Sequence, residues 1–217
     1  MSHITLIRHG QANTGARDEA SYDRLSDLGH EQAAWLGDHL RDSRDFHTRL
    51  YCGSLSRHLD TARSMQTGLD PIRDARLNEW EYFTLAGLLE ESHGIPMPVD
   101  REDFVSHMPQ VFKAWQQGEL IDPPETFDAF ESRVLGVLSD IRAGDGPALV
   151  VTSGGFIGMA MRCALGLDIA AMARVVLSIM NTSVHRLFPI GDELSPVLFN
   201  AVPHLATPDR HFARTHM

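Results

Sequence analysis

The chain has 217 residues and a formal net charge of −10, with 19 lysines and arginines against 29 aspartates and glutamates. Nucleic acid and anionic membrane surfaces repel such an acidic protein, so neither is expected as a partner. No apolar run is long enough to cross a membrane, and two cysteines give no disulfide framework, so we expect a cytoplasmic protein.

The first expected element is a short apolar strand over residues 3–8, which runs directly into Arg8, His9 and Gly10. Arg8 offers paired N–H donors to phosphoryl oxygens and stays charged at any working pH. The neighbouring cation should lower the pKa of His9 and leave a neutral ring nitrogen able to attack phosphorus. Gly10 has no side chain where the backbone must approach a ligand closely. The pattern indicates a phosphate site with a nucleophile, although a strand with an incidental polar loop is an alternative.

Two helices and a second strand follow in the N-terminal half. Ser26 is a typical N-cap residue for a helix over residues 27–42, which has apolar residues on one face: Ala33, Leu36 and Leu40. A strand over residues 49–52 then leads into a helix over residues 56–68. This is a second junction at which a strand ends and a helix begins.

Arg57 falls in the first turn of the helix at this junction, where free backbone N–H groups and the helix dipole favour an anion. His58, the next residue, is expected to face solvent. A short extended piece near residues 75–79 supplies the carboxylate of Glu79. Glu81 is a rival carboxylate, because in an extended segment it would share a face with Glu79.

Residues 83–124, which we call the lid segment, are expected to cover the site. Several apolar residues fall at helical spacing, which favours a helix packed on the core over an aromatic ligand box: Phe104, Met108, Val111, Phe112 and Trp115. The cations Arg101 and Lys113 are outnumbered by acidic residues in the segment. A lid for a bisphosphate should offer extra cations, so the composition favours a monophosphate of otherwise apolar or neutral character.

The C-terminal part continues the alternation of strands and helices. The expected elements are helices over residues 126–142 and 155–165 and strands over residues 148–152, 175–179, 183–188 and 196–200. Ser153, Gly154 and Gly155 form a third strand-to-helix junction with the character of a phosphate loop. The alternation predicts an α/β fold with three layers, a mostly parallel sheet covered by helices on both faces. Ligands bind beyond the carboxyl ends of the strands in such sheets.

Five motifs in one order carry a resemblance to a known family: Arg8 to Gly10, Leu25 to Ala33, Ser54 to Ala62, Leu77 to Glu79, and the Gly-Gly pair after Ser153. With these motifs the chain resembles the histidine phosphatase superfamily, the phosphoglycerate mutase-like group. The resemblance covers roughly the whole chain but is weak between about Tyr82 and Pro124. It implies a phosphoglycerate mutase-like fold in which residues 1–217 form one domain with a helical lid insertion at about 83–124.

The resemblance implies a metal-independent phosphomonoester hydrolase that acts through a phosphohistidine intermediate on a small phosphorylated substrate. His9 would attack phosphorus, and Glu79 would protonate the leaving alcohol and then activate water. The phosphate-binding residues would be Arg8, Arg57, Ser153 and Gly154, with the backbone of Gly155. No cofactor is implied. The twelve histidines include neither a His-Glu-x-x-His pattern nor a Cys/His pair at zinc spacing, so no metal is expected.

Ser153 departs from the family pattern, which usually has a second histidine at this position. A serine hydroxyl brings no positive charge, so we expect an attenuated phosphate ligand and a slower enzyme. The alternative is that the pocket is repacked around serine, with His204 or another donor in the gap. A surface position is nevertheless favoured for His204. A phosphoglycerate mutase-type transferase remains open, although the lid argues against it. A non-catalytic phosphate-binding or interaction protein also remains open, and Ser153 argues for it.

Overall fold

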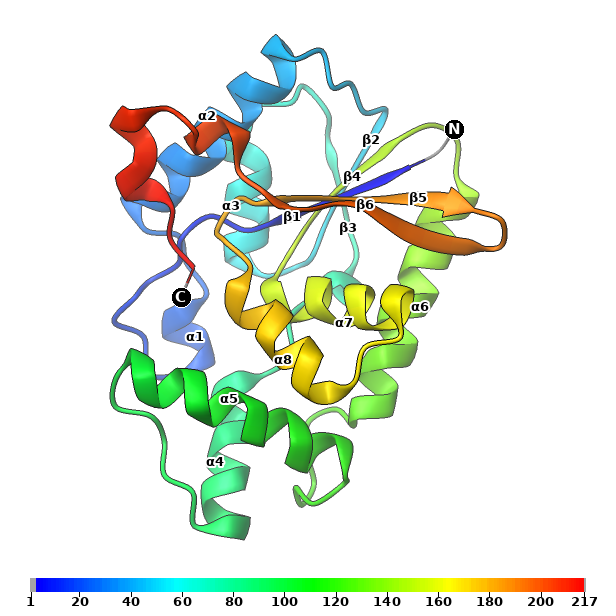
Figure 1. The fold of residues 1–217 in the computed structure, drawn as a ribbon. Coiled ribbons are helices and arrows are strands. Elements are labelled where there is room, and N and C mark those ends of the chain that lie inside the picture. Colours follow the sequence, from blue (N-terminus) through cyan, green and yellow to red (C-terminus); the bar gives the residue numbers. More distant parts are fainter. Residues whose placement is uncertain (1–2, 217) are drawn as a thin grey trace.

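The computed structural model describes residues 3–216, which form a layered α/β structure (Figure 1). The strands are β1 (Ile4–Arg8), β2 (Arg49–Cys52), β3 (Pro71–Arg73), β4 (Ala148–Thr152), β5 (Val184–Ile190) and β6 (Glu193–Ala201). The α-helices are α1 (Glu19–Tyr22), α2 (Asp27–Asp42), α3 (Ser56–Ser64), α4 (Tyr82–His93), α5 (Arg101–Gln116), α6 (Phe127–Ala143), α7 (Gly154–Leu165) and α8 (Ile169–Ser178). Short 3-10 helices are η1 (Ala75–Leu77), η2 (Pro203–Leu205) and η3 (Pro208–Ala213).

The strands of the described residues form one sheet of six strands in the order β3-β2-β4-β1-β5-β6. β1 to β4 run parallel to one another, whereas β5 is antiparallel to both β1 and β6. The expected mostly parallel sheet is therefore confirmed. Arg8 pairs with Thr152 in the register of β1 and β4, so the residues that follow these two strands begin at the same edge.

Helices cover both faces of the sheet, as predicted (Figure 1). α2 and α3 pack on one face around a smaller core: Ile7, Ala33, Leu36, Leu40, Leu50, Cys52, Ala62, Met65, Leu149, Val151 and Val184. The larger core on the other face lies between the sheet and helices α4 to α8. Among the described residues, no helix combines the length and the apolar composition that a membrane crossing requires.

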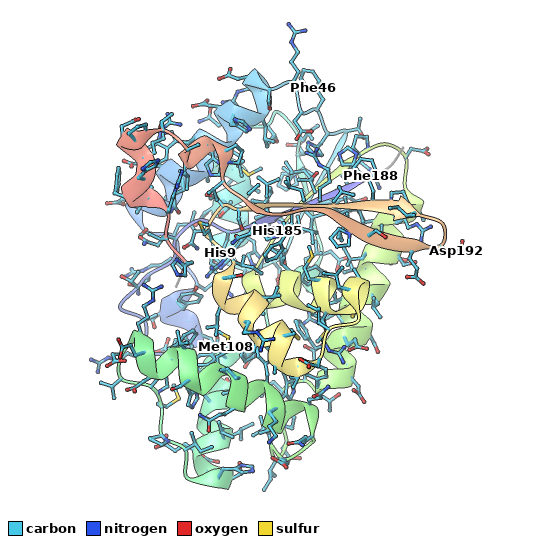
Figure 2. All side chains as sticks on the ribbon, viewed as in Figure 1. His9, Phe46, Met108, His185, Phe188 and Asp192 are labelled. Carbon is cyan, nitrogen blue, oxygen red and sulfur yellow. The ribbon has the colours of Figure 1, made fainter. Side chains whose placement is uncertain are left out.

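The lid segment contributes most of α4 and the whole of α5, which lie on the outer side of α8 (Figure 1). The apolar stripe predicted for α5 is confirmed, since four of its members are buried: Met108, Val111, Phe112 and Trp115. Figure 2 shows Met108 on the side of α5 that faces α8. Phe104, the fifth member, is only partly buried. The stripe therefore attaches the lid segment to the larger core.

The strand predicted over residues 175–179 is wrong, because this stretch is the end of α8. Asp168 caps the helix by accepting a hydrogen bond from the Ala171 N–H at 2.7 Å. Its apolar residues recur every three or four positions and face the core, as shown by Met172 and Val176. The buried side of a helix, not a strand, therefore accounts for the apolar run.

Two glycines bring the loop after β1 against the start of α2. A Cβ atom on Gly10 would lie 2.3 Å from the Gly29 oxygen, and one on Gly29 would lie 2.2 Å from the Gln11 oxygen. Gln32 adds to this contact, because its Oε1 accepts from the Gln11 N–H at 2.8 Å and its Nε2 donates to the Ala213 oxygen at 2.6 Å. The motif from Leu25 to Ala33 therefore holds the loop in place.

We expect Gly29→Ala to lower the free energy of unfolding by about 1–3 kcal/mol or more, because the new methyl group meets backbone that cannot rotate away. Gly136 in α6 is the matched control, since no atom lies within 4 Å of the position of its Cβ. Gly136→Ala should raise the same free energy by about 0.5–1 kcal/mol through helix propensity. Urea denaturation measures both. Equal effects of the two substitutions would contradict the close contact.

Two C-terminal histidines are buried in the fold. His185 is fully buried, with Nε2 2.8 Å from the Ser183 hydroxyl and Nδ1 accepting from the Asn200 N–H at 3.2 Å (Figure 2). His204 is 3% exposed and its Nε2 lies 2.8 Å from the Thr182 hydroxyl. The surface position predicted for His204 is therefore wrong. Burial is the main cause that lowers the pKa of each histidine to about 3.

These histidines should make the protein less stable in acid. Unfolded histidines take up protons below about pH 6.5, whereas the folded ones stay neutral down to about pH 3, so the unfolded state is favoured as the pH falls. At pH 5 each buried histidine should cost about 2 kcal/mol of unfolding free energy. His204→Gln should therefore lose about 2 kcal/mol less than the unmodified protein between pH 7 and pH 5. Denaturant titrations at the two pH values measure this, and identical losses would contradict it.

Candidate functional site

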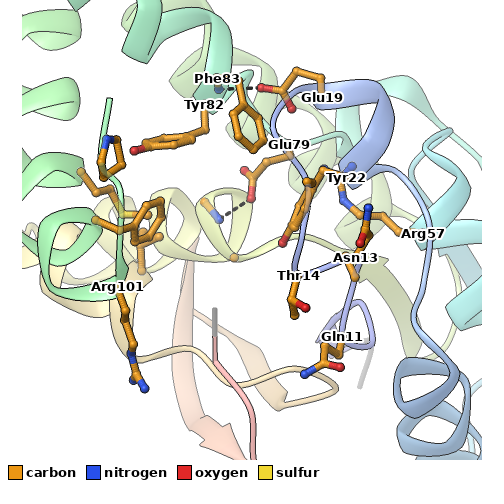
Figure 3. A pocket seen from close by; sticks show the side chains of 18 of the residues that line it. Gln11, Asn13, Thr14, Glu19, Tyr22, Arg57, Glu79, Tyr82, Phe83 and Arg101 are labelled. Carbon is orange, nitrogen blue, oxygen red and sulfur yellow. Dashed lines mark hydrogen bonds between the residues drawn. The ribbon is translucent and has the colours of Figure 1, made fainter. Parts of the chain in front are cut away.

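A cavity of about 480 Å³ opens at the edge of the sheet where β1 and β4 end (Figure 3). Its inner wall carries Arg8, Arg57, Glu79, Gly154 and Gly155, and its outer wall comes from α1, α4 and the start of α5. All five residues of this inner wall are among the site residues predicted from the sequence. The three strand-to-helix junctions thus meet at one place.

His9 follows β1 beside this cavity and is 2% exposed. Its backbone N–H donates to the Thr152 oxygen at 2.9 Å, which ties it to the end of β4. The ring Nδ1 lies 2.7 Å from the Gly10 oxygen. Because a carbonyl can only accept, Nδ1 carries the proton and Nε2 holds the lone pair. Burial, followed by the charges of Arg57 and Arg8, holds the pKa of His9 well below its ordinary value, so the ring is neutral.

The two arginines reach the cavity with part of their guanidinium groups unengaged. Arg8 donates to the Ile179 oxygen, and Arg57 donates to Asp23 Oδ1 at 3.1 Å and lies 4.9 Å from the ring centre of Tyr22. The Nε–H groups of both arginines are buried, and neither has a hydrogen-bond partner among the described residues. A buried N–H donor is rarely left unpaired, so the pair is suited to an anion in the cavity.

Glu79 is held at the other side of the inner wall. Its Oε2 accepts from the Gly155 N–H at 2.8 Å and its Oε1 accepts from the Trp80 N–H at 3.2 Å (Figure 3). Burial raises the pKa of Glu79, and these two hydrogen bonds and the nearby arginines offset part of the rise. A Cβ atom on Gly155 would lie 2.4 Å from Glu79 Oε1, so only glycine fits here.

Glu81 occupies a different environment from Glu79. It is exposed, and its Oε2 accepts a hydrogen bond from the Thr84 hydroxyl at 2.9 Å at the start of α4. Glu79 lines the same cavity as the two arginines, whereas Glu81 does not. The geometry therefore separates the two carboxylates that the sequence left as rivals.

His58, like His204, lies in the interior and not at the solvent-facing position predicted for it. It is fully buried, its Nε2 lies 2.6 Å from the Ser153 hydroxyl oxygen, and its ring centre is 5.7 Å from that of His9. Arg57, His58 and Thr61 belong to the buried side of α3. Their helical spacing is the signal in the sequence that could have identified His58 as a buried residue. Ser153 is itself fully buried and, like His9, is not part of the cavity lining, to which its neighbour Gly154 belongs.

The outer wall of the cavity is largely aromatic. Its rings contact one another in series: the ring centres are 6.4 Å apart for Tyr22 and Phe83, 5.6 Å for Phe83 and Tyr82, and 5.0 Å for Tyr82 and Phe104. Glu19 stands beside these rings, and its Oε1 accepts from the Phe83 N–H at 2.8 Å (Figure 3). Burial raises the pKa of Glu19.

The rim of the cavity carries charge from the lid segment. Arg101 lines the cavity and its NH2 group lies 2.5 Å from His216 Nε2. Asp100, the preceding residue, is also part of the lining and opposes this charge. Lys113, the other predicted lid cation, is not in the lining.

A separate group of possible metal ligands lies at the other end of β1. Ligand atoms of His3, Asp45 and His47 lie within 4.8 Å of one another. Asp45 is paired with Arg186, and His47 Nε2 lies 2.9 Å from the Thr5 hydroxyl. Burial is the main cause that lowers the pKa of His47 to about 4. These contacts already engage the group, and it stands apart from the cavity.

Comparison with known proteins gives one family. The sequence pattern of the histidine phosphatase superfamily, branch 1, matches residues 4–202. A 2,3-bisphosphoglycerate-dependent phosphoglycerate mutase of Brucella ovis is 34% identical in a 97-residue alignment that covers 39% of this chain. The match covers 45% of that mutase, so the chain spans less than half the length of the curated relatives it matches.

Several solved structures share the fold. A phosphoserine phosphatase mutant of Entamoeba histolytica in complex with phosphoserine matches with a TM-score of 0.70 and 18% identity, over 94% of this chain and 100% of that one. A mycobacterial glucosyl-3-phosphoglycerate phosphatase matches with 0.67 and 23%, over 93% and 100%. A phosphoglycerate mutase of Bacillus anthracis matches with 0.68 and 18%, over 94% of each chain. These likenesses confirm the predicted phosphoglycerate mutase-like fold.

Proposed function

Because this chain belongs to the histidine phosphatase superfamily, branch 1, we propose that it hydrolyses phosphomonoesters without a metal, through a phosphohistidine at His9. One observation carries the proposal. Neutral His9, with its lone pair on Nε2, directly follows Arg8, and its ring contacts the Tyr22 ring on which the Arg57 guanidinium packs. The buried Nε–H groups of both arginines have no partner among the described residues. An anion held by two guanidinium groups next to a neutral nitrogen nucleophile is the arrangement that phosphoryl transfer requires.

The proposed reaction has two steps. In the first, His9 Nε2 forms a bond to phosphorus, the ester P–O bond breaks, and Glu79 gives its proton to the leaving oxygen. Arg8 and Arg57 stabilise the charge on the equatorial oxygens. In the second step water attacks the phosphohistidine, Glu79 takes up its proton, and phosphate leaves His9 neutral again. The raised pKa of Glu79 supports this role, because a general acid must hold a proton near the working pH.

Ser153 and the Gly154 backbone would complete the phosphate site at the start of α7. Ser153 carries no charge, and removal of one donor from such a site commonly costs about 2.7–4 kcal/mol of transition-state stabilisation. On this ground we propose turnover below that of a site with an additional cationic donor. The non-catalytic alternative predicts binding of phosphate or vanadate without any turnover.

The cavity walls support a small phosphorylated substrate with an apolar or neutral alcohol portion. Tyr82, Phe83 and Phe104 offer apolar surface, whereas Glu19 and Asp100 would repel a second anionic group. The Brucella relatives favour the mutase alternative, and Arg101 offers one cation for it. The acidic residues of the same cavity argue against a bisphosphate.

The proposed function is tested by trapping the intermediate. A labelled phosphomonoester, quenched without acid, should leave acid-labile, base-stable phosphate on the wild type and none on His9→Ala, because His9 is the proposed nucleophile. A chelator should leave turnover unchanged. Hydrolysis should be faster for alkyl and aryl phosphates with an uncharged alcohol portion than for 3-phosphoglycerate, whose alcohol portion carries a carboxylate.

Label retained on His9→Ala or activity lost with the chelator would overturn the proposal. Conversion of 3-phosphoglycerate to 2-phosphoglycerate would establish the mutase alternative. Vanadate binding without turnover or label would establish the non-catalytic one.

The role of Glu79 can be separated from that of Glu81 by the leaving group. Glu79→Gln should slow hydrolysis of an alkyl phosphate by about 10²–10⁴-fold, because an alkoxide needs a proton to leave. It should slow 4-nitrophenyl phosphate far less at the same step, since 4-nitrophenolate is a stable anion. Glu81→Gln is the matched control and should leave both first-step rates unchanged. Burst kinetics measure that step, and equal losses for the two substrates would remove Glu79 as the acid.

A further inference from the structure

His58 is placed next to the reacting residues by the packing of three separate segments. It lies in the first turn of α3, directly after Arg57, and has no solvent exposure. Gly53 makes room for its ring, because a Cβ atom there would lie 2.2 Å from His58 Nδ1. The ring then reaches Ser153 at the end of β4, with 2.6 Å between Nε2 and the hydroxyl oxygen.

The hydrogen on the imidazole of His58 can be assigned from its surroundings. Nδ1 is buried, and the described residues provide no hydrogen-bond partner for it. A proton on Nδ1 would be a buried N–H without an acceptor, which is rarer and more costly than an unpaired acceptor. The proton therefore sits on Nε2, and His58 donates to the Ser153 oxygen. Burial, followed by the charge of Arg57, keeps the pKa of His58 well below its ordinary value, so the ring is neutral.

Ser153 is left with its own hydrogen to donate. It occupies the N-cap position of α7, yet its side chain makes no capping bond with the helix. Its oxygen accepts from His58, and no acceptor for the hydroxyl hydrogen is found among the described residues. The next residue, Gly154, lines the cavity at a point where a Cβ atom would lie 3.6 Å from Arg8 Nε. Ser153 itself has no exposed surface, so its hydroxyl lies behind this part of the lining, in contact with His58, whose ring centre is 5.7 Å from that of His9.

We propose that His58 and Ser153 act as one hydrogen-bonded unit, in which His58 is a positioning residue that aims the Ser153 hydroxyl at the transferring phosphoryl group. The proposal rests on the proposed function. It gives Ser153 a defined donor direction that a lone serine, free to rotate, would lack. It also identifies His58, not His204, as the donor that fills the space around the serine.

A double-mutant cycle tests whether the two side chains act together. Ser153→Ala and His58→Leu should each lower kcat by about ten-fold or more, with a smaller change in KM, because a preorganised donor acts mainly in the transition state. The double variant should be no slower than Ser153→Ala, within about two-fold, because removal of either member ends the same contact. His58→Gln keeps an N–H donor near the position of Nε2 and should recover part of the loss.

His30 and Ser64 offer a matched control pair, since His30 Nδ1 lies 2.9 Å from the Ser64 hydroxyl on the protein surface. His30→Leu should leave kcat unchanged. If His58→Leu does not fold, as judged by thermal unfolding, the Ser153→Ala and His58→Gln variants and their combination carry the cycle. Losses that multiply in the double variant, or a His58→Leu enzyme as fast as wild type, would overturn the proposal.

Two measurements keep this test separate from that of the proposed function. Vanadate affinity, measured by titration, should fall in Ser153→Ala and in His58→Leu to a similar extent whether or not the wild type turns over. Nitrogen NMR of the free protein should show His58 neutral with its proton on Nε2, and a proton on Nδ1 would overturn the assignment. Absence of label on His9 in the wild type would instead contradict the proposed function alone.

Discussion

The close backbone contact between Gly10 and Gly29 is the constraint on which the arrangement of the site depends. This contact holds the loop after β1 against α2 and so fixes the position of His9, the residue before Gly10. Thr61 extends the same constraint, because its hydroxyl oxygen accepts from the Gly10 N–H at 3.0 Å and donates to the Arg57 oxygen at 2.7 Å. One threonine therefore ties the histidine loop to the helix of the arginine. Residues without chemistry of their own thus position those that have it.

Burial is the second condition that the site imposes on the fold. His9 and His58 are neutral because they are enclosed and lie near guanidinium groups, and enclosure raises the pKa of Glu79 as well. In water Glu79 would be ionised at neutral pH, and each histidine would be protonated below about pH 6.5. This burial lowers the free energy of unfolding in acid, because histidines bind protons in the unfolded state and remain neutral in the folded state. The proposed chemistry and the stability of the protein therefore depend on pH through the same residues.

The sequence was sufficient where local patterns decide the structure. Arg8, Arg57 and Glu79 could be placed at one edge of the sheet because strand ends and helix starts are read from nearby residues. The position of His58 could not be predicted in this way, since it depends on room left by Gly53 and on Ser153, which is 95 residues away. The end of α8 was misread because its β-branched, apolar residues fit a strand as well as a buried helix. Tertiary contacts settled both cases.

Trp80 links the inner wall of the cavity to the lid segment. Its backbone N–H contacts Glu79, while its ring packs on Phe112 and Trp115 of α5, with ring centres 4.7 Å and 5.7 Å apart. Trp80 itself lines the cavity, so the buried face of α5 supports both the cavity wall and the backbone beside the carboxylate proposed as the acid. A substitution in the lid segment that changes the shape of the cavity would therefore also shift Trp80 and, with it, Glu79. Under the proposed function, substrate choice and proton transfer would therefore change together.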